Sequence, residues 1–180
     1  MPGRRSLLWS AFRLLFAVAL GASGAAAQEV HFAPEERLDA IDAQLISGAK
    51  SSIDFASYSL MDSAVLGALN AASRRGVAIR IVLDPQERQE FVGLGDLSDN
   101  VRIKRSGSLM HLKAYTIDGK VLRTGSANFS ASGERQQDND LVIIRNAGAA
   151  AKFDAHFQKM WDAAQPMIEF ERAIKALEPN

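Results

Sequence analysis

The stretch HLKAYTIDGKVLRTGSAN, residues 111–128, decides the fold of this 180-residue chain. Residues 111–117 and 120–124 are rich in apolar and β-branched side chains, which favour strands. Asp118-Gly119 between them is a strong signal for a tight hairpin turn. The stretch therefore predicts two antiparallel strands joined at that turn. Written as a pattern it is H-x-K-x4-D-x6-G-S-x-N, and the chain contains it once.

The polar residues of this stretch form a set that suits one anionic phosphodiester. Alternate residues of a strand share a face, so His111 and Lys113 point the same way. A histidine offers a nucleophilic nitrogen near neutral pH, and a lysine offers a fixed positive charge. Gly125 permits close backbone approach, while Ser126 and Asn128 add a hydroxyl and an amide. In phosphoryl transfer, most of the rate acceleration comes from donors that stabilise charge on the phosphoryl oxygens.

The pattern resembles the signature of the phospholipase D superfamily, whose members cut phosphodiesters without a metal or other cofactor. Members of ordinary length carry two copies, and a single copy resembles the bacterial nuclease branch, in which two identical chains each supply half of one site. The resemblance covers about Leu38 to Trp161. It implies that His111 attacks phosphorus to form a phosphohistidine, and that His111 of the partner subunit protonates the leaving alcohol. A homodimer with a composite site is therefore expected.

The same resemblance implies an acidic residue that orients the histidine. In the nuclease branch this is usually a glutamate in a Glu-Asn pair just before a hydrophobic strand. The matching text here is the Asp-Asn pair at 138–139, so Asp138 is expected to orient His111. Asp140 and Glu134 are the alternatives. Asp118 is expected to fix the hairpin rather than to act in catalysis.

The rest of the chain alternates predicted strands and helices, which is typical of an α/β domain with a mixed sheet flanked by helices. An aromatic stripe on the last helix indicates core packing rather than a ligand site. Residues 85–100 are polar and weakly patterned, which predicts a loop or a short irregular helix. The predicted strands are 51–60, 77–83, 101–104 and 139–145, and the predicted helices begin at Pro34, after the cap residue Asp62 and at Ala147.

Residues 1–27 have the pattern of a secretory signal peptide. Arg4 and Arg5 precede a largely apolar run, and Ala25-Ala26-Ala27 suits cleavage before Gln28. The expected mature protein is one catalytic domain, residues 28–180, exported to the periplasm or secreted, with no lasting membrane anchor. An uncleaved anchor is the alternative. The chain has no cysteine, so disulfides and cysteine-based metal sites are excluded.

Charge along the chain favours an anionic substrate at the motif. The formal net charge is zero, with 21 basic and 21 acidic residues. Removing three leader arginines leaves 18 basic against 21 acidic residues, which is not typical of a protein that coats nucleic acid by charge alone. Between residues 101 and 135, however, basic residues outnumber acidic ones. These basic residues are Arg102, Lys104, Arg105, Lys113, Lys120, Arg123 and Arg135.

Three functions compete on this evidence. The leading hypothesis is an endonuclease that cuts DNA or RNA with little sequence preference. The second is a phospholipase D that converts phosphatidylcholine to phosphatidate and choline. Its apolar entry would come from Phe91, Val92, Leu94 and Leu97, with Leu109-Met110 beside the motif. The third is a nucleic-acid-binding module without catalysis, which the complete set of polar motif residues disfavours.

Overall fold

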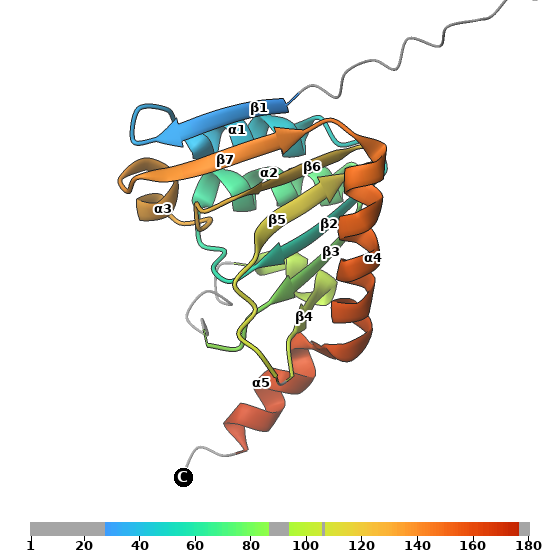
Figure 1. The fold of residues 1–180 in the computed structure, drawn as a ribbon. Helices are drawn as coiled ribbons and strands as arrows, with labels where there is room; N and C mark the ends of the chain where they lie inside the picture. The colour runs from blue at the N-terminus through green and yellow to red at the C-terminus, as the bar shows by residue number, and fades with distance from the viewer. Residues whose placement is uncertain (1–27, 87–93, 106, 177–180) are drawn as a thin grey trace, which may run out of the picture.

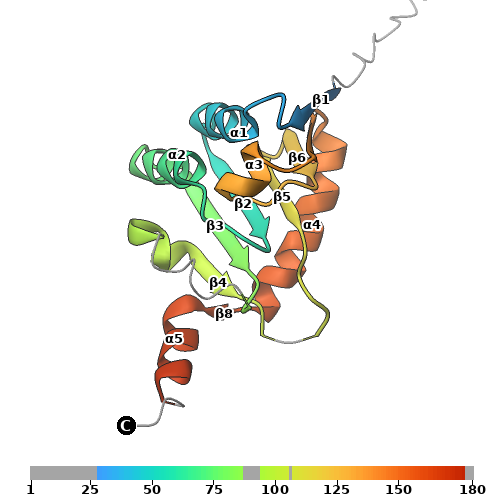
Figure 2. The ribbon, with the colours of Figure 1, turned by 90° about the vertical axis from the view of Figure 1, so that its left-hand side faces the viewer.

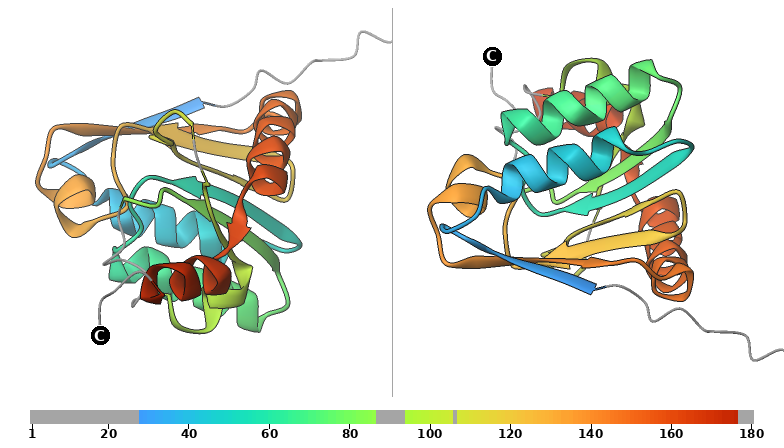
Figure 3. Two further views of the ribbon diagram at one scale, coloured as in Figure 1. Left: turned by 90° about the horizontal axis from the view of Figure 1, so that it is seen from below. Right: turned by 90° about the horizontal axis from the view of Figure 1, so that it is seen from above.

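The computed structural model describes residues 28–86, 94–105 and 107–176, so the expected signal peptide lies outside the described residues. Within them, a mixed sheet of eight strands has the order β1-β7-β6-β5-β2-β3-β4-β8 (Figure 1). Helices α1 and α2 lie on one face of the sheet and α4 lies on the other (Figure 2). Views from both ends show the same layering (Figure 3). The predicted mixed sheet flanked by helices is confirmed.

The bounds of the elements follow the chain. The strands are β1 (Gln28–Ala33), β2 (Ser52–Ser57), β3 (Ala78–Leu83), β4 (Val101–Ile103), β5 (Lys113–Ile117), β6 (Val121–Gly125), β7 (Asn139–Ile144) and β8 (Gln165–Pro166). The helices are α1 (Leu38–Ser47), α2 (Ser63–Arg74), the 3₁₀ helix η2 (Gly95–Asn100), α3 (Ala131–Arg135), α4 (Ala147–Ala163) and α5 (Met167–Lys175).

The β5–β6 hairpin turns at the predicted dipeptide. Asp118 and Gly119 have φ angles of 53° and 62°, the left-handed backbone that a two-residue hairpin turn requires at both positions. The Asp118 carboxylate accepts hydrogen bonds from the backbone N–H groups of Lys50, Ser51 and Ser52. Burial raises its pKa, but these donors outweigh burial and hold the pKa below its usual value. These hydrogen bonds tie the hairpin turn to the segment that leads into β2.

Some elements were not predicted, and β1 shows why. It is an edge strand that pairs only with β7, and its apolar side chains Val30 and Phe32 are 52% and 55% exposed. Val30 and Phe32 alternate with Glu29 and His31, but an alternating run this short is a weak strand signal. The short elements β8 and α3, and helix α5, were missed as well. Strand β5 begins at Lys113, so His111 lies just before the strand rather than within it.

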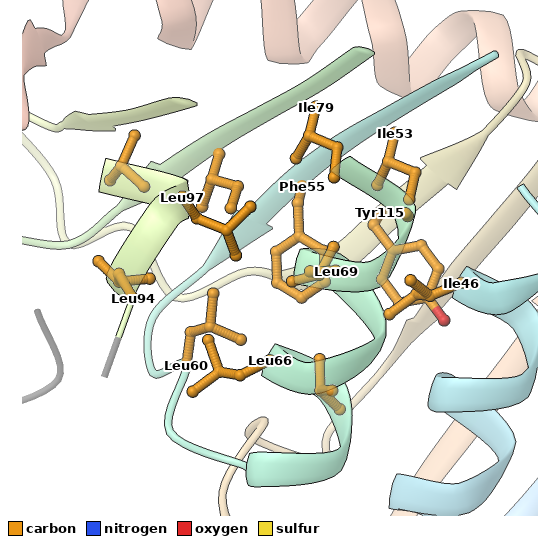
Figure 4. Close-up of a cluster of buried hydrophobic side chains, with 14 of the residues drawn as sticks. Ile46, Ile53, Phe55, Leu60, Leu66, Leu69, Ile79, Leu94, Leu97 and Tyr115 are labelled. Carbon is orange, nitrogen blue, oxygen red and sulfur yellow. The ribbon is translucent and has the colours of Figure 1, made fainter. Parts of the chain in front are cut away.

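The larger core lies between the sheet and α1 and α2. Leu66 and Leu69 of α2 face Phe55 and Tyr115 of the sheet (Figure 4). Leu94 and Leu97 are fully buried in the same cluster. The expectation that these two leucines line an apolar entry to the site is therefore wrong, because the helix η2 turns them into the core. Phe91 and Val92 lie outside the described residues.

The opposite face of the sheet is covered by α4. Phe157 is fully buried and stacks between Phe153 and Trp161, with ring centroids 6.1 and 6.0 Å away. Met110 joins this cluster and is also buried, so it does not border an open entry. The prediction that the aromatic stripe packs in the core is confirmed.

A buried ion cluster connects the sheet to α1 and α3. Arg123 of β6 is fully buried and donates to both carboxylate oxygens of Asp42, at 2.9 and 2.5 Å. It also donates to Glu134, at 3.2 Å, and to the carbonyl oxygen of Lys113, at 3.0 Å. The Tyr115 hydroxyl donates to Asp42 at 2.6 Å. Every polar group here is positioned by at least one neighbour in a different element.

Four of the seven basic residues between 101 and 135 do not lie at the motif, so the expectation that their positive charge gathers around it is corrected. Arg123 is in the core, and Arg135 pairs with Asp39 and Asp62. Arg102 lies over the Trp161 ring, and Lys120 follows the hairpin turn at the far end of the sheet. These basic residues are close together in the sequence, but in the folded chain they lie in the core, in ion pairs, over an aromatic ring or at the far end of the sheet. The remaining three, Lys104, Arg105 and Lys113, lie at the end of the sheet that carries the motif.

We expect replacement of Arg123 by Met to lower the free energy of unfolding by about 3–5 kcal/mol, because Asp42 would remain buried without its cation. Urea denaturation measures this loss. The matched control is Arg145→Met, which removes a 2.8 Å ion pair to Glu29 that is 44% and 41% exposed. Its expected cost is about 0–1 kcal/mol. If both variants lost the same free energy of unfolding, the buried cluster would not stabilise the fold more than a surface ion pair does.

Candidate active site

The motif residues meet at one edge of the sheet, which faces the viewer in Figure 2. Strands β2, β3 and β4 are parallel and end at this edge, and the antiparallel strand β5 begins there. Lys113 is paired with Ser57 of β2. Strand β6 ends at the same edge, since it pairs antiparallel with β5. The hairpin thus brings residues 111–113 next to residues 125–128.

His111 and Lys113 both contact Tyr58, which follows the end of β2. The His111 and Tyr58 ring centroids are 4.8 Å apart, and the rings are tilted by 58°. The Lys113 Nζ lies 5.5 Å from the Tyr58 centroid and donates to the His111 carbonyl oxygen at 2.9 Å. The Tyr58 N–H donates to the Leu112 carbonyl oxygen at 2.9 Å. The predicted shared face of His111 and Lys113 agrees with these contacts.

Lys113 is a partly desolvated cation. Its side chain is only 6% exposed, and burial lowers its pKa. An ammonium group with little water around it interacts more strongly with an anion, because the local dielectric constant is lower than in bulk water. His111, in contrast, is exposed. The pair therefore combines an accessible imidazole with a fixed positive charge beside it.

The loop after β6 depends on Gly125. Its φ angle is 152°, and a Cβ there would lie 2.3 Å from the Asp140 carbonyl oxygen, so only glycine fits. The Ser126 N–H donates to that same carbonyl at 3.1 Å. The Ser126 hydroxyl donates to the Asn139 Oδ1 at 2.9 Å and accepts from the Asp140 N–H at 2.9 Å. An entering phosphate oxygen would compete with Asn139 for the hydroxyl proton.

Asn128 carries an unsatisfied polar atom. Its Oδ1 is buried without a hydrogen-bond partner among the described residues. Its backbone is tightly packed, since a Cβ on Gly133 would lie 2.4 Å from the Asn128 carbonyl oxygen. Such an oxygen costs free energy unless a donor reaches it. A substrate hydroxyl or a donor from a second subunit would remove this cost.

The three acidic candidates occupy different surroundings. Asp138 is exposed, and it lines a cavity of about 650 Å³ together with Ser126. The Asp140 carboxylate accepts from the Ser126 N–H at 3.0 Å. Glu134 is buried and bonded to Arg123. In the described part of the chain, no carboxylate forms an ion pair or hydrogen bond with the His111 ring, so the orienting role of Asp138 stays a prediction.

Tyr58 is the residue that sequence reasoning missed. The sequence pattern places it within a predicted strand, without a role in the site. Its position just after β2, the neighbour of β5, was the available signal, but this signal requires the strand order.

Among the described residues, no group of three His, Cys, Asp or Glu side chains could hold a metal ion. No helix in the same residues is long and apolar enough to cross a membrane.

Comparison with known proteins identifies the class as a phospholipase D-like domain. The family described as "Cardiolipin synthase, PLD-like domain" matches residues 43–161. The chain is 31% identical over 126 residues to a phospholipase D of Rickettsia bellii, covering 68% of this chain and 63% of that protein. It is 30% identical over 142 residues to the mitochondrial cardiolipin hydrolase of Drosophila melanogaster, covering 66% of this chain and 56% of that protein.

A solved structure agrees with this class. Nuc from Salmonella typhimurium, a phospholipase D family member, superposes with a TM-score of 0.73 at 26% identity, covering 78% of this chain and 97% of that chain. The chain therefore belongs to the phospholipase D superfamily. It spans about three fifths of the length of the curated relatives that it matches.

Glu134 generates a prediction about pH. Burial raises the pKa of its carboxyl group to about 9, and the Asp42 carboxylate acts in the same direction. Between pH 4.5 and about 9 the folded protein then keeps a proton that the unfolded chain has lost. Stability from this group is complete below pH 4.5 and falls as pH rises. A glutamine side chain cannot ionise, so we expect the E134Q variant to gain stability over the parent by at most about 1.4 kcal/mol per pH unit in that window.

Urea unfolding of both proteins across this pH range measures the difference. Glu29→Gln is the control for loss of a surface carboxylate, since Glu29 is an exposed partner of Arg145. A parent–variant difference that stays constant with pH would show that Glu134 is ionised in the folded protein.

Proposed function

We propose that this protein is a metal-independent phosphodiesterase that cuts DNA or RNA with little sequence preference. The observation that carries the proposal is the meeting of His111 and Lys113 with the Gly125–Asn128 loop at one sheet edge, in a chain of the phospholipase D superfamily. An exposed imidazole beside a desolvated ammonium group suits attack on an anionic phosphorus centre.

The reaction has two balanced steps. In the first, a His111 nitrogen bonds to phosphorus, and the P–O bond to the leaving group breaks. The leaving oxygen takes a proton from the protonated ring of His111 of the partner subunit. In the second, that neutral ring removes a proton from water, the hydroxide attacks phosphorus, and the P–N bond breaks. Lys113, Ser126 and Asn128 hold the phosphoryl oxygens through both steps.

A homodimer completes this proposal. One chain supplies one motif histidine, whereas the two steps need two. Two of the five large apolar side chains that are exposed in the described residues support a partner at this edge. Met61 and Leu109 are each 50% exposed, Met61 lies three residues after Tyr58, and Leu109 lies two residues before His111. A second copy placed over the site would bury them and supply the second imidazole.

A lipid substrate is the second candidate, and the same apolar rim favours it. Leu109 and Met61 would contact acyl chains if the site opened toward a membrane surface. Relatives named phospholipase D and mitochondrial cardiolipin hydrolase add to this candidate. The basic residues beside the site weigh in favour of nucleic acid. We further propose export to the periplasm or the medium, on the leader pattern of residues 1–27.

We expect the purified mature protein to cut plasmid DNA and bis(p-nitrophenyl) phosphate in excess EDTA, because no step uses a metal. The variant His111→Ala should lose at least about 1,000-fold in rate, since it removes the nucleophile. His156→Ala is the matched control, as His156 is exposed on α4. Protein quenched under alkaline conditions, in which a phosphohistidine is stable, should carry substrate-derived phosphorus on His111.

Three outcomes would count against this assignment. Intact DNA together with intact bis(p-nitrophenyl) phosphate would contradict a phosphodiesterase, and DNA binding without cleavage would support the non-catalytic module. Faster release of choline from phosphatidylcholine vesicles than cleavage of DNA, by the same preparation, would favour the lipid candidate.

The composite site predicts a quadratic loss of activity on mixing. If the parent and the His111→Ala protein are unfolded together in equal amounts and refolded, subunits pair at random. A site that needs both histidines then survives in only about one quarter of the dimers. Total activity should follow the square of the parent fraction. A linear dependence, or full activity in a strictly monomeric sample, would show that one chain is sufficient.

A further inference from the structure

We propose that a cavity beside the active site binds a second phosphate group of the substrate, and that this substrate is a nucleic-acid strand. The cavity has a volume of about 230 Å³ and lies between the segment after β4 and the C-terminal turns of α4. Its lining residues are Lys104, Arg105, Lys159, Met160 and Ala163. The inference rests on the proposed function, because it concerns the same substrate.

The first wall of the cavity is anchored at the edge that carries the motif. Strand β4 runs parallel to β3, so Lys104 and Arg105 follow its end at that edge. The Lys104 N–H donates to the Leu83 carbonyl oxygen at 3.0 Å, and its ammonium group donates to the Ser108 carbonyl oxygen. The Met110 N–H donates to Asp84 at 2.9 Å. The segment that leads from Lys104 to His111 is thus held at both ends.

The second wall is held by a cation stacked on an aromatic ring. The Arg102 guanidinium carbon lies 4.4 Å from a Trp161 ring centroid, and Arg102 Nη1 donates to the Trp161 carbonyl oxygen at 2.9 Å. Trp161 in turn stacks on the buried Phe157. Lys159 projects from this fixed part of α4. Because the backbone of both walls is positioned before a ligand arrives, binding has to order only the exposed side chains of Arg105 and Lys159.

The two cavities on either side of the motif carry opposite charges, so a polyanionic substrate would extend from the motif toward only one of them. The sheet order places β1 and β7 on one side of β5 and β6, and β3 and β4 on the other. The cavity beside β1 and β7 is lined by four carboxylate residues, and the cavity beside β4 is lined by three cations. The carboxylate residues are Glu35, Glu36, Asp138 and Asp140.

A chain of phosphates is therefore attracted toward Lys159 and repelled from Asp138. Phosphatidylcholine has one phosphate, so it would leave the basic cavity without a ligand. A nucleic-acid strand repeats its phosphate at every residue and supplies the second group at once.

The charge reversal Lys159→Glu tests this subsite, with Lys152→Glu as the matched control. Lys152 is exposed on the same helix two turns earlier, and its replacement changes the net charge equally. The readout is the ratio of kcat/KM on an oligothymidylate of about eight nucleotides to kcat/KM on bis(p-nitrophenyl) phosphate, which has one phosphate. We expect this ratio to fall about tenfold in K159E and less than about twofold in K152E.

Salt dependence gives a second readout. For K159E, the slope of log kcat/KM against log salt should become shallower by about 0.7 for each single-strand phosphate that the variant no longer binds. Equal ratios and equal slopes in the two variants would overturn the subsite. So would a K159E defect on vesicles containing cardiolipin, a lipid with two phosphates, without any defect on the oligonucleotide.

Failure of the proposed function is distinguishable from failure of the subsite. If the parent protein hydrolyses neither substrate, the phosphodiesterase proposal fails. The dissociation constant of a fluorescent oligothymidylate, measured by anisotropy, then decides the subsite alone. Weaker binding by K159E than by K152E supports it, and equal binding overturns it.

Discussion

The Arg123 guanidinium group is the constraint on which the site geometry depends. A buried arginine is favourable only if nearly all of its donors are used, because desolvation of the charge is costly. Here those donors reach Asp42, Glu134 and the Lys113 carbonyl oxygen, while the Phe129 ring lies 4.3 Å from the guanidinium carbon. Lys113 belongs to the first half of the motif, and Phe129 directly follows Asn128 at the end of the second half. One buried cation thereby connects the strand that begins at Lys113 to the loop that follows Gly125.

The parts of this arrangement that could be predicted are those encoded locally. The Asp118-Gly119 turn needs only two residues with left-handed backbone. The apolar and β-branched residues before this turn are sufficient to predict the strand that begins at Lys113, although His111 lies just before it. Gly125 could be predicted for the same reason, since its role is a close backbone approach. These features depend on covalent geometry over a few residues, and tertiary contacts did not override them.

The parts that could not be predicted depend on residues distant in sequence. Linear spacing groups Arg123 with the surface cations because its partner Asp42 is 81 residues away. Tyr58 reaches His111 only because β2 lies beside β5 in the sheet. Strand β1 has only a short alternating run, and nothing in the sequence around Leu94 and Leu97 indicates that η2 turns them inward. In each case the deciding factor is burial against a specific neighbour, which one-dimensional periodicity does not contain.

The single chain has features that an incomplete site would have. The Asn128 Oδ1 is buried without a partner among the described residues, and the Ser126 hydroxyl proton is engaged by Asn139. The His111 ring rests on Tyr58 rather than on a carboxylate. A substrate hydroxyl or a donor from a second subunit would satisfy the Asn128 Oδ1, and a phosphate oxygen at the same end of the sheet would compete with Asn139 for the Ser126 hydroxyl proton. Because the cations lie on one side of that edge and the carboxylates on the other, the same phosphate would experience a field that orients the rest of the substrate. The fold thus supplies positioning and direction, and in the proposed mechanism the second imidazole comes from a second copy of the chain.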